Sequence, residues 1–288
     1  MILSKLGKLD SAEATEYLTS AQKGYNVAVE DTLDVVDKLS AVDLISATDV
    51  GGLAEGMSQV ANNANLAGVS MDRLLGYLAT IGEVTQANMS EVGTSLNAIF
   101  SRMGNIKLSR LKDYQNGSED LSNVETVLRG QGIALRDSAG EFRNFGEVLD
   151  EVASRWDEFS SVSQRAIASA FAGTNHMEDF LVLMQNYDTA MKYTEASLNS
   201  SGQAMEKFEA YQDSLEGKTE RLRNAFIQLS NTLLDSDFLK MLADGATAAT
   251  KALDGLVSLL TPLGTIGVGA GIGLFIKNLG RRKVLKIA

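Results

Sequence analysis

The sequence contains few nitrogen or sulfur side chains that could bind a metal. His176 is the one histidine, and the chain contains no cysteine. A zinc site needs three or four nitrogen or sulfur ligands, so the sequence predicts no zinc site at His176. Without cysteine, neither a disulfide framework nor a thiolate metal site can form. This composition fits a reducing cytoplasm or a virion assembled in one.

Two glycine-containing motifs resemble nucleotide-binding loops but lack required residues. Gly217-Lys218-Thr219 matches the end of a phosphate-binding loop, but Gln212 stands where that motif needs its first glycine. The glycine run at 267–273 lacks the dinucleotide-binding spacing and a downstream acid. We therefore expect no nucleotide and no other cofactor.

Carboxylates are numerous, and acid–base chemistry would need two of them in a desolvated pair. Glu147 and Glu151, spaced i,i+4, would share a helix face, and further acids stand close by in the sequence at Asp150, Asp157 and Glu158. Solvated acidic helix faces have this pattern, and nothing in it indicates a raised pKa. The sequence predicts no catalytic site, so we expect the protein not to be an enzyme.

Charge is distributed unevenly along the chain. The formal net charge is −11, but residues 277–288 hold five basic residues and no acid. Residues 1–276 therefore carry 21 basic and 37 acidic groups, a balance of −16. An acidic body repels nucleic acid, so we expect no direct DNA binding by the main region.

The elements available to position any site are predicted to be helices. Pro262 is the one proline in 288 residues, and an interior proline costs a helix about 3 kcal/mol. Capping signals precede apolar residues at helical spacing, as at Asp10 with Glu13 and at Ser70. Further starts are predicted at Ser90, Ser122, Ser161 with Gln164, and Asn175 with Glu178. We expect a mostly α fold, an elongated multi-helix array.

The predicted organisation has five parts. A small β-hairpin is expected near 133–143, because the turn sequence Asp137–Gly140 separates two short runs. The parts are an N-terminal helical region (1–110), a loop and the hairpin (111–145), a helical core (146–254), an apolar segment (255–276) and a basic tail (277–288).

One long helix is predicted over 203–235, with apolar residues that step by three and four. It is either an amphipathic helix of a globular core or a coiled coil between copies. We name its apolar positions the seam: Met205, Phe208, Leu215, Leu222, Phe226, Leu229 and Leu233.

The apolar segment 255–276 has no charged residue over 22 positions. This is long enough to span a bilayer core of about 30 Å. Membrane insertion, enclosure by a chaperone or tube, and a flexible linker are the three alternatives. Its candidate membrane-facing residues are Leu259, Ile266, Val268, Ile272, Leu274, Phe275 and Ile276.

Ordered blocks over about residues 10–255 resemble the core of the tail tape measure proteins of tailed bacteriophages. Several blocks in the family's order are more specific than one short motif. The blocks are Gly68–Thr85, Glu91–Gly93 through Ile99–Lys107, Gly132–Asp137 through Phe142–Val152, Trp156, Ala166–Ala168, Ala172–Thr174, Leu183–Asp188 and Leu233–Leu239.

The resemblance implies an extended protein that lies in the lumen of the tail tube and acts as a molecular ruler. Tube subunits would polymerise around it during assembly in the host cytoplasm, and its length would set the tail's length. The implied partners are the tail tube protein, tail assembly chaperones and other copies of the chain, with the host membrane as a further partner on infection. The resemblance brings no catalytic residues.

The chain is short for this family, because 288 residues span about 430 Å even when fully helical. We expect a fragment, a truncated prophage gene or one piece of a split gene. The alternative functions are a membrane-active, holin-like or pore-forming protein acting through 255–276, and a generic helical scaffold or chaperone-bound assembly factor.

Overall fold

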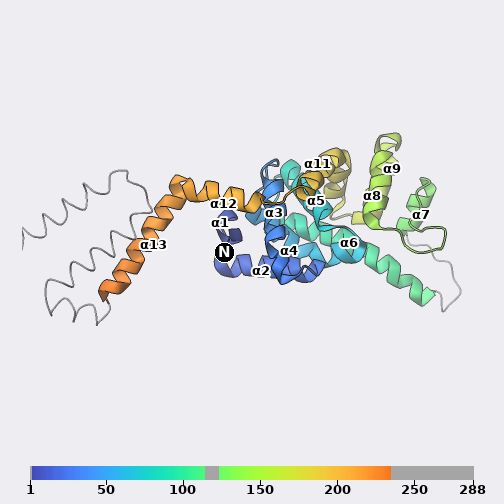
Figure 1. The fold of residues 1–288 in the computed structure, drawn as a ribbon. Coiled ribbons are helices and arrows are strands. Elements are labelled where there is room, and N and C mark those ends of the chain that lie inside the picture. Colours follow the sequence, from blue (N-terminus) through green and yellow to red (C-terminus); the bar gives the residue numbers. More distant parts are fainter. Residues whose placement is uncertain (1, 114–122, 235–288) are drawn as a thin grey trace, which may run out of the picture. The chain divides into compact units, whose positions relative to one another are not determined.

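The computed structural model describes residues 2–113 and 123–234. Most of them lie in α-helices, which confirms the predicted mostly α fold class (Figure 1). Internal contacts divide the chain into two units, Met1–Phe208 and Glu209–Ala288. The first unit begins with α1 (Ile2–Leu6), α2 (Ser11–Tyr25), the 3₁₀ turn η1 (Val29–Asp31), α3 (Thr32–Asp43), α4 (Val50–Ala67), α5 (Met71–Thr85) and α6 (Met89–Asp113).

The later helices have at most 12 residues each, apart from the last one described, which has 20. They are α7 (Asn123–Gly130), α8 (Phe145–Ser154), the 3₁₀ turn η2 (Trp156–Glu158), α9 (Ser161–Ala172), α10 (Met177–Gln185), α11 (Tyr187–Leu198), α12 (Gln203–Asp213) and α13 (Leu215–Leu234).

Two predicted helix starts are confirmed by hydrogen bonds. The Asp10 carboxylate accepts from the Glu13 amide at 2.8 Å, and the Glu13 carboxylate accepts from the Asp10 amide at 3.0 Å. This reciprocal capping box satisfies amides that a helix start leaves free. Ser70 caps α5 by accepting from the amide of Arg73 at 3.3 Å.

At two other predicted starts a helix does begin, but the expected cap does not form. Helix α9 begins at Ser161, as predicted, but Ser160 caps it, and the side chain of Gln164 donates to the Trp156 carbonyl oxygen at 2.9 Å. Helix α10 begins without a side-chain cap, so the predicted cap at Asn175 does not form.

Glycines allow the helices of the first unit to pack backbone against backbone. A β-carbon on Gly93 would lie 2.3 Å from the carbonyl oxygen of Gly56, at the contact between α6 and α4. A β-carbon on Gly76 would lie 2.4 Å from the carbonyl oxygen of Ala190, at the contact between α5 and α11. Only glycine fits at these two points, because any side chain would push the helices apart.

A row of buried aromatic rings connects α6 to the elements that follow it. Ring centroids lie 5.7 Å apart between Phe100 and Phe145, 5.4 Å between Phe145 and Phe171, and 5.1 Å between Phe171 and Phe180. The indole of Trp156 lies 6.4 Å from Phe180. These distances are typical of favourable aromatic pairs, and they bring α8, α9, α10 and η2 together.

The β-hairpin predicted near 133–143 is wrong: no strand forms within the described residues. A single antiparallel bridge joins Arg136 to Phe142 around the turn. The Arg143 backbone amide donates to the Leu135 carbonyl oxygen at 3.0 Å, and its side chain donates to the carbonyl oxygen of Ala134 at 2.8 Å. The flanking runs are too short to build a ladder, since a two-stranded ribbon is marginal even when longer.

The single long helix predicted over 203–235 is also wrong, because it is interrupted at Ser214. The Ser214 hydroxyl accepts from the Gly217 amide at 3.1 Å and donates to the Tyr211 carbonyl oxygen at 2.5 Å. It therefore ends α12 and starts α13, because a serine that bonds to nearby backbone groups competes with the helical ladder.

The C-terminal predictions lie outside the described residues. These are the apolar segment 255–276, with its candidate residues from Leu259 to Ile276, and the basic tail 277–288. Among the helices that are described, none combines the length and the apolar character needed to cross a membrane.

Candidate functional site

A bidentate ion pair between Arg73 and Asp150 joins the first turn of α5 to α8. The Arg73 Nη1 and Nη2 atoms donate to Asp150 Oδ1 and Oδ2 at 2.8 and 2.7 Å. Arg73 Nη1 also donates to the Gly146 carbonyl oxygen at 3.2 Å. The planar guanidinium matches the carboxylate, so this geometry fixes the orientation of both side chains.

Two tyrosines extend the ion pair to the start of α11. The Tyr187 hydroxyl donates to Asp150 Oδ1 at 2.8 Å and lies 3.1 Å from the Tyr77 hydroxyl. Tyr77 is buried on α5, and its ring centroid is 6.0 Å from that of Tyr187. The network therefore connects α5, α8 and α11 through side chains far apart in the sequence.

The network stabilises the charged forms of Arg73 and Asp150 and the neutral form of Tyr187. Burial raises the pKa of Asp150, but the hydrogen bonds from Arg73 and Tyr187 and the charge of Arg73 together lower it more, so the pKa lies below its usual value. The hydrogen bond to Asp150 raises the pKa of Arg73. Burial, followed by the neighbouring Tyr77 and Asp150, raises the pKa of Tyr187. Asp150 is thus an anion and Tyr187 a neutral donor near neutral pH.

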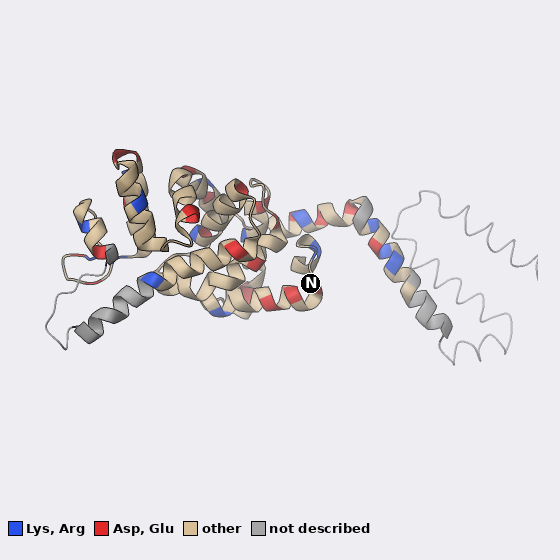
Figure 2. Cartoon of the chain, turned by 180° about the vertical axis from the view of Figure 1, so that it is seen from behind, with Lys and Arg blue, Asp and Glu red and all other residues tan. Residues whose placement is uncertain are grey.

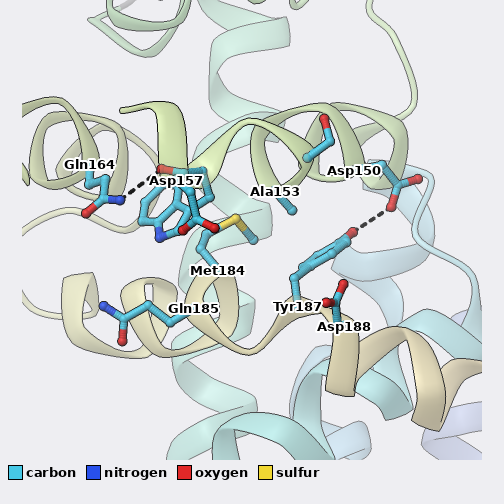
Figure 3. A pocket seen from close by; sticks show the side chains of 10 residues that line it. Asp150, Ala153, Asp157, Gln164, Met184, Gln185, Tyr187 and Asp188 are labelled. Atoms are coloured by element: carbon cyan, nitrogen blue, oxygen red, sulfur yellow. Dashed lines mark hydrogen bonds between the residues drawn. The ribbon is translucent and has the colours of Figure 1, made fainter. Parts of the chain in front are cut away.

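A pocket of about 440 Å³ lies beside this network. Figure 3 shows its labelled side chains coming from α8 and η2 on one side and from α10 and α11 on the other, with Gln164 reaching in from α9. The lining residues are Asp150, Ala153, Ser154, Trp156, Asp157, Gln164, Met184, Gln185, Tyr187 and Asp188.

The pocket is acidic and rich in hydrogen-bonding groups. Its ten lining residues include three aspartates but no lysine, arginine or histidine. Asp157 and Asp188 are exposed, whereas Trp156 is only 4% exposed and its Nε1–H has no acceptor within the described residues. No group of three or more metal-ligating side chains occurs in the part of the chain that is described. The two exposed carboxylates give this pocket an acidic surface.

The seam predicted from the sequence lies on α12 and α13 and not at this pocket. Met205 and Leu222 are exposed, at 40% and 52%, and Phe208 is half-buried. The side chains of the other seam positions, Leu215, Phe226, Leu229 and Leu233, are outside the described part of the structure. Burial of the whole seam, in a core or between copies, stays a prediction.

Sequence reasoning missed the pocket and its network. Asp150 and Glu151 were both expected on a solvated acidic face, but Asp150 pairs with Arg73, and Glu151 accepts from Arg143 at 2.6 Å. Arg73 and Asp150 stand 77 positions apart, so no local spacing could have indicated the pair. Trp156, the chain's one tryptophan, was a composition signal that could have directed attention to the pocket.

Comparison with known proteins shows which family the chain resembles. A family model described as "Phage-related minor tail protein" matches residues 1–173, which include both members of the Arg73–Asp150 pair. The "Tape measure protein" of Pneumococcus phage Dp-1 is 23% identical over 258 residues, covering 88% of this chain and 21% of that protein. The chain thus spans about a fifth of that relative's length. No solved structure matches the chain. Because the family model matches more than half of the sequence, the chain belongs to the phage-related minor tail protein family.

Proposed function

We propose that this chain acts as a tail tape measure protein, occupying the lumen of the tail tube during assembly and setting the tail's length. The main support for this proposal is the 23% identity, over 88% of the chain, to a protein named as a tape measure protein. Family membership implies a component of the virion tail. The helical chain supports a ruler, because a helix converts residue number into length at about 1.5 Å per residue.

The proposed partners are tail tube subunits, tail assembly chaperones and other copies of the chain. The exposed seam residues Met205 and Leu222 support contacts between copies. Acidic residues, coloured red in Figure 2, occur on several helices, including α2, and residues 1–276 have a balance of −16. Direct DNA binding by this body is therefore not part of the proposal.

The ruler is tested by changing the chain's length in the phage that encodes it. Three extra copies of residues 219–232, inserted in frame after 232, preserve the heptad register and add about 40 residues. Electron micrographs of the tails should show an increase of about 60 Å, since each helical residue adds about 1.5 Å.

Synonymous recoding of the same codons is the matched control, because it changes the gene without changing the protein. Tails should then keep their original length. Unchanged tails in the insertion phage, at normal virion yield, would show that the number of residues in this chain does not set tail length.

We also propose that residues 255–276 help the genome pass the host envelope by entering a membrane. The support is the absence of charge over these 22 positions and the five basic residues that follow, which would remain at an anionic surface. The full chain should co-sediment with anionic vesicles. Substituting Ile272→Asp and Phe275→Asp should abolish this, because each mid-bilayer acid costs about 3 kcal/mol. A wild-type chain left in the supernatant would remove the membrane role.

A further inference from the structure

We propose that the corner between α12 and α13 is a conformational switch, which straightens into one continuous helix over 203–234 when the seam pairs with a second copy of the chain. This inference deepens the proposed contact between copies and rests on it. Three observations support it: the corner interrupts few helical hydrogen bonds, its bend depends on a glycine, and the seam continues across it.

Side chains at the corner replace a few hydrogen bonds of a helix. In a continuous helix, the carbonyl oxygens of Tyr211 and Gln212 would accept from amides four residues later. In the bent form, the Tyr211 carbonyl accepts from the Ser214 hydroxyl, and the Gln212 carbonyl accepts from Arg221 Nη2. The Gly217 amide donates to the Ser214 hydroxyl at 3.1 Å. Straightening therefore exchanges three local side-chain hydrogen bonds for helical ones.

The helical ladder is regular on both sides of the corner. The Ser214 amide donates to the Ala210 carbonyl oxygen, and the Lys218 amide donates to the Ser214 carbonyl oxygen, both at 3.1 Å. Residues 203–234 contain no proline, and Gly217 is their one glycine. Since proline and glycine are the residues that most disfavour a helix interior, the sequence permits one helix across the corner.

The bent form depends on Gly217 and leaves one buried donor unsatisfied. A β-carbon on Gly217 would lie 2.3 Å from the Tyr211 carbonyl oxygen and 3.0 Å from the Gln212 α-carbon. Arg221 Nε is buried and has no acceptor within the described residues, although buried donors normally have one. The unsatisfied donor disfavours the bend, and a side chain at position 217 would exclude it.

The seam continues in register across the corner. Its positions step by three and four from α12 into α13, as they would along a single helix. Met205 on α12 and Leu222 on α13 are 40% and 52% exposed, so the bent form leaves seam side chains of both helices uncovered. A coiled coil needs one continuous apolar face. A second copy therefore binds the straight form better and shifts the population toward it.

Two spin labels measure the straightening in the full chain. The chain has no cysteine, so the double variant Ala210→Cys, Ile227→Cys creates the two labelling sites, both at exposed positions outside the seam. In a straight helix these positions lie about 26 Å apart, and a bend brings them closer. Pulsed electron paramagnetic resonance should give the shorter distance in dilute protein. A population at about 26 Å should grow as unlabelled chain is added.

A substitution at Gly217 should favour the straight form without changing the seam. Gly217→Ala excludes the bend and improves helix propensity, so the labels should lie about 26 Å apart even in dilute protein. Self-association in sedimentation velocity should be about fivefold tighter. Lys218→Ala is the matched control, because it places alanine at the neighbouring exposed position. This control should keep the wild-type distance and association.

A substitution at Leu215 should have the opposite effect. Leu215→Pro suits the first position of α13 but cannot lie inside a continuous helix, so the shorter distance should persist at every concentration. Leu215→Ala removes the same seam side chain without this restriction. It should still straighten when unlabelled chain is added.

The outcomes separate the switch from the contact between copies. A short distance in chains that are associated, a short distance in Gly217→Ala, or straightening of Leu215→Pro would overturn the switch and leave the contact between copies intact. A chain that stays monomeric at every concentration would overturn that contact, and the switch with it. Neither result decides the tail-length proposal, which is measured on tails in micrographs.

Discussion

The carboxylate of Asp37 on α3 accepts a 2.7 Å hydrogen bond from the backbone amide of Ala204, 167 residues later in the chain. Its second oxygen accepts from the Gly202 amide at 2.9 Å. Asp37 is only 5% exposed. It belongs to α3, far from α12 in the sequence, yet its carboxylate caps the N-terminus of α12. The start of α12 is therefore held by tertiary structure.

Removing this distant cap should destabilise the first unit. Asp37→Ala leaves two helix-start amides without their carboxylate, and we expect the free energy of unfolding to fall by about 2 kcal/mol. Urea unfolding followed by circular dichroism measures the change. Asp34→Asn, at an exposed position on the same helix, should stay close to wild type. Equal stability of the Asp37→Ala protein would mean that the cap contributes nothing.

The Arg73–Asp150 ion pair should make stability depend on acid pH. The folded-state pKa of Asp150 is lowered, so its contribution is present above the ordinary carboxyl pKa of about 4 and is lost as pH falls through the lowered value. Asp150→Asn should therefore lose less stability than wild type between pH 5 and pH 2. The effect should be modest, about 1 kcal/mol, because the Asp150 side chain is 40% exposed and screened by solvent.

Urea unfolding at a series of pH values measures this slope. Asp157→Asn is the matched control, because Asp157 is exposed and forms no ion pair within the described residues; it should keep the wild-type pH dependence. Parallel pH profiles for wild type and Asp150→Asn would contradict the assigned role of the ion pair.

A side chain at Gly76 should separate α5 from α11. Its β-carbon would meet the Ala190 carbonyl oxygen at 2.4 Å and the Thr194 hydroxyl at 2.5 Å, so Gly76→Val should lower the free energy of unfolding by about 3 kcal/mol. Thermal unfolding should show a lower midpoint. Gly130→Ala is the control, because nothing lies within 4 Å of a β-carbon there, and its midpoint should not fall. A wild-type midpoint for Gly76→Val would show that the two backbones can move apart without cost.

A substitution at the exposed seam residue Leu222 tests whether the seam packs in the core of a single chain or forms a coiled coil between copies. If copies associate through the seam, Leu222→Asp should reduce self-association in sedimentation velocity while leaving the unfolding of the single chain unchanged, because the residue is 52% exposed. Asn224→Asp adds the same charge at an exposed position outside the seam and should associate like wild type. A chain that is monomeric before substitution would exclude the coiled coil.

Local chemistry made part of this fold predictable. Asp10 and Glu13 cap α2 from within three residues of each other, and Ser70 caps α5 in the same way, so both starts could be predicted from neighbouring residues. Avoidance of proline before Pro262 indicated helices throughout. The break at Ser214 had a local signal too, a serine three residues before Gly217, but the heptad pattern continues across it and favoured one helix.

Other features were decided only by tertiary structure. Arg73 and Asp150 are separated by 77 positions, and Asp37 and Ala204 by 167, so their pairing depends on which helices pack together. A helical period identifies the face of a helix that is buried but not its partner. The pocket around Trp156 exists because α8 and η2 meet α10 and α11. The sequence by itself determined the helices, their nearby caps and the family of this protein. Packing between distant helices decided the ion pairs and the pocket, because side chains that meet in space need not be near one another in the chain.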